Sequence, residues 1–492
     1  MEGFEVQQII HELKPQPPKK DIELITHAYD FALKAHSKHT RFSGEPYFIH
    51  VFETAKNLAR YEMDATTIAA GFLHDTLEDT PITEEEMEEE FGPEIVGLIK
   101  GVTKLGKIKY RGHARHVESL RKFLLALAQD YRVLMIKLAD RLHNLRTLQH
   151  VRPDKQRRIA LESIEVYAPL ADRLGIGRLK GEIEDAAFPF AYPKEAEMIE
   201  EILREKGEET KKSLESVYGD LTRQLSKTQI KVHKVDYRIK HKYSLWKKLQ
   251  KYEMNIENIY DIVALRVIVE SVEECYAVLG LIHSTWKPLP GRIKDYIALP
   301  KLNGYQSIHT TVFTGTGGIV EIQIRTQKMH GRAEYGIASH GEYKEKSKNN
   351  NQDEKFQWIN NLTDMDTENP QQEDFLKSLK ADFFNDRIFV FTPEGEVIDL
   401  PKESTPIDFA YAVHSDIGNT SSSAKINGKM AALNTKLHSS DIVEIQTRKD
   451  GSPKSKWLDF VKTSVAKKHI RNYLNEHSEG NLLRRFFPKS LR

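Results

Sequence analysis

The chain has very little cysteine and no long apolar run, and its charges nearly cancel. Cys275 is the one cysteine among 492 residues, which excludes an internal disulfide and a cysteine-rich zinc module. A membrane-spanning helix needs about 18 consecutive apolar residues, and no stretch of this chain approaches that length. The first residues lack the pattern of a secretory signal. These absences predict a soluble, cytoplasmic protein with no membrane partner. Lys plus Arg number 73 and Asp plus Glu 72, so any nucleotide or RNA binding must come from local patches.

The spacing of apolar residues changes along the chain. Residues 21–191 have helical spacing, and the charged stretch 195–227 is typical of a connecting helix. The β-branched runs 261–269 and 318–325, with helical spacing at 273–285 between them, predict a mixed α/β unit.

The last third is different again. A polar stretch at 341–374 is typical of a linker. Strand patterns at 387–392, 397–400 and 441–447, with a short helix at 407–414, then predict a small β-rich unit. Residues 457–487 are predicted to be helical and basic.

Two histidines and two aspartates form a candidate metal site. They are His50, His74, Asp75 and Asp140. Two imidazoles and two carboxylates suit a divalent metal such as manganese or iron with open positions for water. If residues 73–79 are helical, Glu78 and Asp79 lie one turn further, where they could guide or deprotonate a water that attacks a phosphate. An adjacent His–Asp pair alone is more often structural, but His50 and the segment 137–144 favour the metal interpretation.

A second candidate site lies in the middle of the chain. As a strand, the segment 305–311 would project Tyr305, Ser307, His309 and Thr311 from one face. With Lys301 and Asn303 nearby, this face could hold a purine base and its phosphates. A basic cluster upstream could neutralise a polyphosphate, although such clusters are also common on ordinary surfaces. Its members are Arg238, Lys240, Lys242, Lys247 and Lys248.

Acidic residues complete this second site. In the strand 320–325, alternation directs Val320, Ile322 and Ile324 to a core and places Glu321, Gln323 and Arg325 on a polar face. Asp261 opens the other predicted strand, so Asp261 and Glu321 could together hold the Mg²⁺ of a nucleoside triphosphate. These patterns together indicate a phosphate-transfer site.

The order of these segments resembles that of the long Rel/SpoT enzymes, which make and destroy the alarmone (p)ppGpp. The matching segments are 43–47, 74–79, 101–107, 138–144, 286–301, 305–311, 321–326 and 405–414. The resemblance covers nearly the whole chain and implies a multidomain fold. It consists of an all-α HD-type hydrolase domain (1–195), connector helices with an α/β nucleotidyltransferase-like synthetase domain (196–345), a linker (346–383), a small β-grasp TGS domain (384–448) and the start of a helical region (449–492).

The resemblance also implies roles for individual residues of the hydrolase. His50, His74, Asp75 and Asp140 would bind Mn²⁺. Glu78 and Asp79 would orient or activate the water that removes pyrophosphate from the 3′ position. The residues implied to contact the nucleotide are Arg41, Ser43, Asn144 and Thr147.

For the synthetase, the resemblance implies that Asp261 and Glu321 bind Mg²⁺. Glu321 would also assist the 3′-hydroxyl of GDP or GTP in attacking the β-phosphate of ATP, giving (p)ppGpp and AMP. Tyr305 would stack on guanine. Lys301, Asn303 and His309 would hold the guanosine nucleotide, and Arg238, Lys240, Lys248, Arg292 and Lys294 would contact the phosphates of ATP. The segment 292–295 matches the basic form of this loop, which belongs to bifunctional members.

The sequence therefore predicts a bifunctional (p)ppGpp synthetase and hydrolase. His414 and the basic helix 462–471 are candidate contacts for uncharged tRNA and the ribosome. Two alternatives stay open. One is a hydrolase whose degenerate synthetase senses nucleotides, because Tyr237, Ile239 and Gly341 replace residues usual in the synthetase. The other alternative is a tRNA- or ribosome-binding regulator in which neither site turns over.

Overall fold

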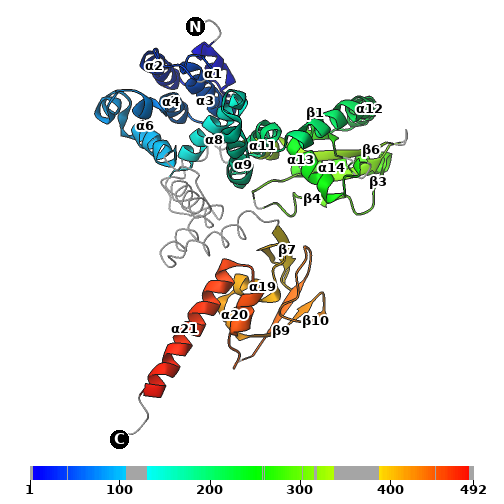
Figure 1. The fold of residues 1–492 in the computed structure, drawn as a ribbon. Helices are drawn as coiled ribbons and strands as arrows, with labels where there is room; N and C mark the ends of the chain where they lie inside the picture. The colour runs from blue at the N-terminus through cyan, green and yellow to red at the C-terminus, as the bar shows by residue number, and fades with distance from the viewer. Residues whose placement is uncertain are drawn as a thin grey trace. The chain divides into compact units, whose positions relative to one another are not determined.

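The computed structural model describes residues 4–41, 43–106, 130–256, 259, 261–301, 303–314, 318–336, 387–448 and 450–486. The chain forms two compact units. Among the described residues, 4–106 and 130–336 belong to the first unit and 387–486 to the second. Figure 1 shows the elements of both. The predicted linker 346–383 and Gly341 lie outside the described residues.

The N-terminal part of the first unit is built from helices, as predicted for residues 21–191 (Figure 1). They are α1 (Val6–Glu12), α2 (Lys19–Ala35), α3 (Phe48–Arg60), α4 (Ala65–Leu73), α5 (Thr76–Asp79), α6 (Glu84–Gly106), α8 (Tyr131–Arg146), η1 (Leu148–His150), α9 (Pro153–Glu162), the π-helix η2 (Ser163–Tyr167), α10 (Ala168–Arg173) and α11 (Gly177–Ala191). Helices α2, α3 and α8 surround α4, whose apolar residues are all buried. The hydrophobic core therefore fixes the helices that carry the metal-site residues.

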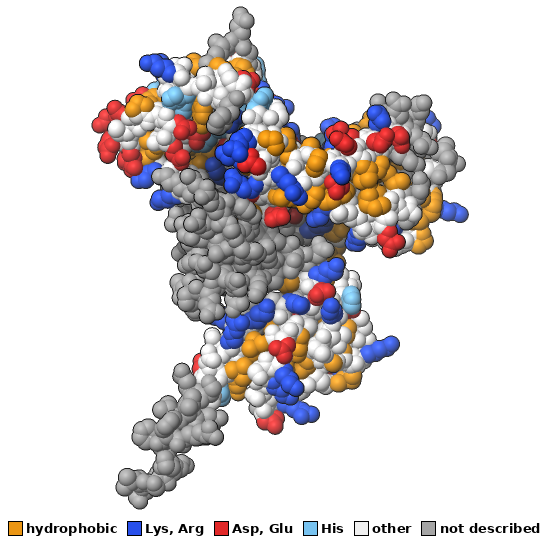
Figure 2. Space-filling model, viewed as in Figure 1, with side chains coloured by type: hydrophobic (Ala, Val, Ile, Leu, Met, Phe, Trp, Pro, Cys, Tyr) orange, Lys and Arg blue, Asp and Glu red, His pale blue; other side chains and the backbone are white. Residues whose placement is uncertain are grey.

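The acidic start of α6 is a solvated helix face. Every glutamate from 84 to 90 is exposed, whereas Met87 is fully buried, and acidic side chains gather over this helix in Figure 2. The helix is interrupted at Gly92, which has a φ of 78° and precedes Pro93. No chemistry needs to be assigned to this run.

The expectation of one continuous helix over residues 73–79 is wrong. Helix α4 ends at Leu73 and α5 begins at Thr76, so His74 and Asp75 lie in the turn between them. Asp75 has φ −100° and ψ −2°, away from regular helical values, and this interrupts the helix. One turn of helical hydrogen bonding survives, because the backbone N–H of Asp79 donates to the carbonyl of Asp75 over 2.9 Å.

The rest of the first unit is a sheet with helices, which confirms the predicted α/β unit. Its elements are α12 (Pro193–Leu225), β1 (Val232–Ile239), α13 (Lys242–Lys251), β2 (Val263–Val269), α14 (Val272–Thr285), β3 (Lys287–Pro288), β4 (Lys294–Asp295), β5 (Ile308–Phe313), β6 (Ile319–Thr326) and α15 (Gln327–Tyr335). The six-stranded sheet has the order β1-β2-β6-β5-β3, with β4 paired to β5. Strands β2 and β6 pair in parallel, and the other strand pairs of this sheet among the described residues are antiparallel.

One face of this sheet forms the core and the other is polar. Helices α12 and α14 cover the apolar face, where Val320, Ile322 and Ile324 are buried as predicted. Gln323 and Arg325 lie on the opposite face, yet only 1% and 3% of their surfaces are exposed. Part of the polar face is therefore buried, and polar groups there need hydrogen-bond partners.

Tyr305 and Ser307 do not lie on a strand, contrary to the expectation for 305–311. Strand β5 begins at Ile308. Gly304 has a φ of 74°, and its N–H donates to the carbonyl of Lys301 over 2.8 Å, so the chain turns here instead of extending. Tyr305 nevertheless lies at the predicted site, because the Tyr305 hydroxyl is 2.8 Å from Nε2 of His309.

The turn between α10 and α11 meets the α/β part at two glycines. Gly175 and Gly336 have φ values of 75° and 59°. A Cβ at Gly336 would lie 2.3 Å from the carbonyl oxygen of Leu174, and one at Gly175 would lie 2.9 Å from that of Asn303. Only glycine permits this close backbone approach.

The second unit is small and β-rich, with a β-grasp-like arrangement as predicted. It contains β7 (Arg387–Phe391), β8 (Val397–Pro401), α19 (Pro406–Val413), α20 (Ser415–Thr420), β9 (Ser421–Ile426), β10 (Lys429–Ala431), β11 (Val443–Thr447), η6 (Ser455–Asp459) and α21 (Ser464–Phe486). A parallel bridge between Phe391 and Ile442 joins the pair β7-β8 to the sheet β10-β9-β11. Among the described residues, no helix has both the length and the apolar character needed to cross a membrane.

Candidate active sites

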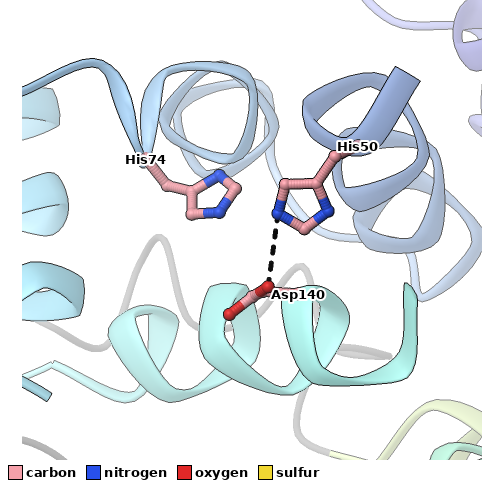
Figure 3. Close-up of side chains that lie close together, drawn as sticks. All are labelled: His50, His74 and Asp140. Atoms are coloured by element: carbon pink, nitrogen blue, oxygen red, sulfur yellow. Dashed lines mark ion pairs between the residues drawn. The ribbon is translucent and has the colours of Figure 1, made fainter. Parts of the chain in front are cut away.

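Three helices bring the predicted metal ligands together in the first unit. His50 on α3, His74 after α4 and Asp140 on α8 point toward one another, as Figure 3 shows. Their ligand atoms all lie within 4.8 Å of one another. Asp75 Oδ2 lies 3.4 Å from His50 Nε2 and 3.1 Å from His74 Nε2. The four residues therefore form one cluster, of which His50, His74 and Asp140 are buried.

The chemistry of this cluster fits a divalent cation. Nδ1 of His74 lies 2.8 Å from the carbonyl oxygen of Gly71 and must carry a proton, which directs Nε2 at the carboxylates. This Nε2 is buried and has no well-oriented hydrogen-bond partner among the described residues. Burial alone would lower the pKa of His74, but Asp75 and Asp140 outweigh it and raise that pKa to about 9. A cation bound here would satisfy the same carboxylates.

A surrounding layer of hydrogen bonds orients the two carboxylates. The Tyr47 hydroxyl donates to Asp75 Oδ2 over 2.6 Å, and Lys137 Nζ lies 2.7 Å from Asp140 Oδ2. Asn144 Nδ2 donates to Asp140 Oδ1. Against the effect of burial, Lys137 and His50 hold the pKa of Asp140 well below its usual range. Sequence reasoning missed Tyr47 and Lys137, although the helical spacing from 137 to Asp140 was a signal for Lys137.

A pocket of about 210 Å³ opens beside the cluster. Its lining includes all the predicted nucleotide contacts, which are Arg41, Ser43, Asn144 and Thr147. Arg41 donates to Asn144 Oδ1 over 2.5 Å and to Thr147 Oγ1 over 3.2 Å. Lys137 and Arg141, which were not predicted, also line it. Glu78 and Asp79 are exposed on α5, just after Asp75.

In the α/β part, Asp261 is held by two lysines. Its Oδ2 lies 2.6 Å from Lys240 Nζ and its Oδ1 lies 2.7 Å from Lys248 Nζ. Although burial opposes it, these ammonium groups lower the pKa of Asp261 to about 2. The carboxylate is therefore charged and neutralised by residues predicted to contact ATP.

Glu321 has different partners on the polar face of the sheet. Gln323 Nε2 donates to its Oε1 over 2.8 Å, and His309 Nδ1 lies 3.4 Å from the same oxygen. Burial, with Lys301 and other nearby cations, holds the pKa of His309 well below its usual range. A neutral His309 can accept a hydrogen bond from the Tyr305 hydroxyl at Nε2, so Tyr305, His309 and Glu321 lie in a row.

Lys301 faces this row. Its Nζ lies 4.7 Å from the ring centre of Tyr296 and 5.1 Å from that of Tyr305. Although part of the residue is exposed, burial of the ammonium against these rings lowers its pKa to about 8. The nearby Lys294 and Lys180 add to the shift, and Asp172 opposes it.

The remaining predicted contacts lie around this face. Arg238 on β1 and Lys294 on β4 are exposed, and Arg292 Nη1 donates to the Tyr252 hydroxyl over 3.3 Å. Tyr237 and Ile239 lie on the same edge strand as Arg238 and are also exposed. The Tyr237 ring stacks on that of Tyr218, which packs against the core of the sheet.

A partly buried ion-pair network on this part of the sheet was not predicted. Arg266 binds both carboxylate oxygens of Asp236 at 2.7 Å, and Arg325 lies 3.1 Å from Glu334. Because α15 carries Glu334, the network fixes that helix to strands β2 and β6.

In the second unit, the predicted RNA contact His414 is 63% exposed, and its Nδ1 accepts a hydrogen bond from the Asp416 N–H.

Three protein families match the chain in sequence. They are described as "HD domain" at residues 28–177, "Region found in RelA / SpoT proteins" at 237–348 and "TGS domain" at 388–447. The first covers the histidine and aspartate cluster. The second begins at Tyr237 and covers Asp261 and Glu321.

Relatives in other organisms match over most of the chain. The guanosine-3′,5′-bis(diphosphate) 3′-pyrophosphohydrolase of Aquifex aeolicus is 45% identical over 94% of this chain and 66% of its own length. The GTP pyrophosphokinase of Myxococcus xanthus is 43% identical over 95% and 62%, and the bifunctional (p)ppGpp synthase/hydrolase SpoT of Escherichia coli is 42% identical over 93% and 65%. The chain thus spans somewhat under two thirds of these relatives. Matches to all three domains in one order place it in the Rel/SpoT family.

Proposed function

We propose that this chain both makes and hydrolyses (p)ppGpp. The observation that carries the proposal is the presence of two separate polar clusters within one compact unit. One is the histidine and aspartate cluster, and the other is the polar face of the sheet. Relatives named for each of the two activities support it. Both the activity and its substrates, ATP, GDP or GTP and (p)ppGpp, are proposals for this chain.

In the proposed hydrolase site, the nucleotide occupies the pocket beside Asp140. Arg41, with Asn144 and Thr147 as its partners, would hold the nucleotide, and Lys137 lies where it can meet a phosphate. We assign Glu78 and Asp79 to orienting the water, because they are exposed directly after Asp75. The two imidazoles favour Mn²⁺ over Mg²⁺. Such a cation would polarise the phosphate and acidify the attacking water.

In the proposed synthetase site, the basic residues contact ATP and the Tyr305 row receives the guanosine nucleotide. Lys240 and Lys248 would exchange Asp261 for the phosphates of ATP, while Asp261 and Glu321 take Mg²⁺. Glu321 would assist removal of the proton from the 3′-hydroxyl. Tyr305 would stack on guanine, with Lys301, Asn303 and His309 beside it.

Uncharged tRNA and the ribosome are proposed as further partners of the second unit. His414 is exposed and accessible to an RNA end, and the start of α21 carries exposed basic residues such as Arg471. Uncharged tRNA bound with salt-sensitive affinity that His414→Ala weakens would support this assignment. We also propose a cytoplasmic location, because the substrates are cytoplasmic nucleotides.

The hydrolase is tested with ppGpp labelled in its 3′ pyrophosphate. The chain stripped of metal by a chelator should release no labelled pyrophosphate, and Mn²⁺ should restore release. Asp75→Ala should be inactive at every Mn²⁺ concentration, while Asp261→Asn should hydrolyse normally. An Asp75→Ala protein that still releases pyrophosphate would contradict the assigned centre. Lack of release by the folded, Mn²⁺-loaded chain would contradict the proposed hydrolase, and an RNA-binding regulator would be favoured only if synthesis were absent as well.

A further inference from the structure

His143 contacts a predicted metal ligand from behind. It is buried on α8, with 5% of its surface exposed, and its Nδ1 lies 2.9 Å from Nδ1 of His50. The other ring nitrogen of His50, Nε2, faces Asp75 and Asp140 at 3.4 Å from each. His50 thus points one nitrogen at the cluster and the other at His143.

The direction of the hydrogen bond between these two rings follows from a third residue. One of the two Nδ1 atoms must donate and the other must accept. Arg41 Nη1 lies 3.4 Å from the His143 Nδ1 and can only donate. His143 Nδ1 therefore carries no proton and accepts from both neighbours. Consequently the proton of His50 lies on Nδ1, and its Nε2 is left with a lone pair for a cation.

The Arg41 guanidinium is also connected to a second predicted metal ligand, Asp140, through Asn144. Arg41 Nη2 donates to Asn144 Oδ1, and Asn144 Nδ2 donates to Asp140 Oδ1. Two adjacent residues of α8 therefore connect Arg41 to His50 and to Asp140. Partners that orient metal ligands in this way typically change metal affinity about 10- to 100-fold when they are removed.

We propose that His143 is a positioning residue for the metal centre: its Nδ1 accepts the proton of His50 and keeps the Nε2 lone pair of His50 directed at the cation. This inference rests on the proposed function, because it requires the cluster to bind Mn²⁺. His143 itself touches neither the cation nor the substrate. Its effect is on metal affinity before any nucleotide binds.

The test measures Mn²⁺ binding without nucleotide, from the electron paramagnetic resonance signal of free Mn²⁺. Every protein carries Asp261→Asn, so that the second predicted cation site contributes nothing. His143→Leu removes the acceptor and should weaken binding about 10- to 100-fold. His143→Asn places an amide oxygen near the position of Nδ1 and should restore affinity close to that of the parent. His27→Asn changes an exposed histidine paired with Glu90 and is the matched control.

Each outcome decides the inference. If His143→Leu binds Mn²⁺ as tightly as the parent, the inference is wrong. It is also wrong if His143→Asn binds Mn²⁺ as weakly as His143→Leu, because the loss would then come from the shape of the side chain and not from the missing acceptor. If thermal unfolding shows that His143→Leu does not fold, His143→Gln replaces it, because its amide extends beyond the Nδ1 position. Weaker Mn²⁺ binding by His143→Gln, together with parental Mn²⁺ binding by His143→Asn, then supports the inference. A parent that binds no Mn²⁺ refutes the metal centre, a result distinct from the failure of His143 alone.

Discussion

The side-chain amide of Asn303 donates a hydrogen bond to the carboxylate of Asp172 over 3.2 Å. Asn303 belongs to the loop predicted to bind the guanosine nucleotide, whereas Asp172 lies on α10 of the helical part. Lys180 on α11 pairs with the same carboxylate at 3.3 Å. The helical part thus holds an amide donor that the proposed guanosine nucleotide would need.

Releasing this amide should strengthen nucleotide binding. Asp172→Ala frees the Asn303 donor, so we expect the KM for GDP in (p)ppGpp synthesis to fall roughly two- to ten-fold, equivalent to one hydrogen bond. The measurement uses an Asp75→Ala background, so that product is not hydrolysed. Asp154→Ala, which removes an exposed carboxylate on α9, should leave KM unchanged. An unaltered KM in Asp172→Ala would show that the contact does not compete with the nucleotide.

Removing the Asp261 carboxylate should separate ATP binding from turnover. Lys240 and Lys248 are neutralised by Asp261 in the free chain, so Asp261→Asn should bind ATP several-fold more tightly in the absence of Mg²⁺. Synthesis should nevertheless fall roughly 10²-fold or more, because the metal ligand is lost. Lys248→Gln, in contrast, should weaken ATP binding. Calorimetric titration with and without Mg²⁺ distinguishes these outcomes, and weaker Mg²⁺-free binding by Asp261→Asn would refute the exchange.

The charge of Lys301 should make the KM for GDP in the proposed synthesis of (p)ppGpp depend on pH in the alkaline range. Burial lowers its pKa to about 8, so the ammonium is present below that pH and is lost as the pH rises through it. The phosphates of GDP stay ionised over this range, hence the KM for GDP should rise between pH 7 and 9. Arginine stays charged throughout, so Lys301→Arg should remove the pH dependence even if it changes KM itself. A parental KM that is flat to pH 9 would contradict the role.

A single buried carboxylate should control the stability of the second unit. Asp408 is fully buried and accepts hydrogen bonds from the backbone and hydroxyl groups of Thr405 and Thr463 and from the backbone of Lys462. Asp408→Ala leaves these donors unsatisfied and should destabilise this unit by about 3 kcal/mol or more. Calorimetry should show the transition of this unit at lower temperature and the other unchanged. Asp416→Ala, whose side chain is 84% exposed, should have little effect.

Sequence patterns predicted the elements that carry the sites, because apolar periodicity directly reflects burial. The strand with Val320, Ile322 and Ile324 packed as expected. What the sequence did not reveal are local backbone breaks. The turn at Gly304 and the helix break at Asp75 depend on backbone conformations that periodicity does not encode.

Residues that act through others were also beyond sequence reasoning. His143 is 93 residues from His50, and Tyr47 contacts Asp75 only because α3 packs beside α4. Both lie in segments that match the family, 43–47 and 138–144, but nothing in those segments assigns either residue to a metal ligand. Lys137 and Asn144 are different, since they lie three residues before and four residues after Asp140 on α8, a helical spacing that the sequence shows.

The most direct measurement incubates the Asp75→Ala chain with ATP, GDP and Mg²⁺ and separates the nucleotides by ion exchange. Because this variant should not hydrolyse its product, a bifunctional enzyme predicts ppGpp and AMP in equal amounts. The same variant carrying Asp261→Asn should yield neither. Absence of ppGpp from a correctly folded Asp75→Ala protein would contradict the synthetase and leave a hydrolase with a nucleotide-sensing domain.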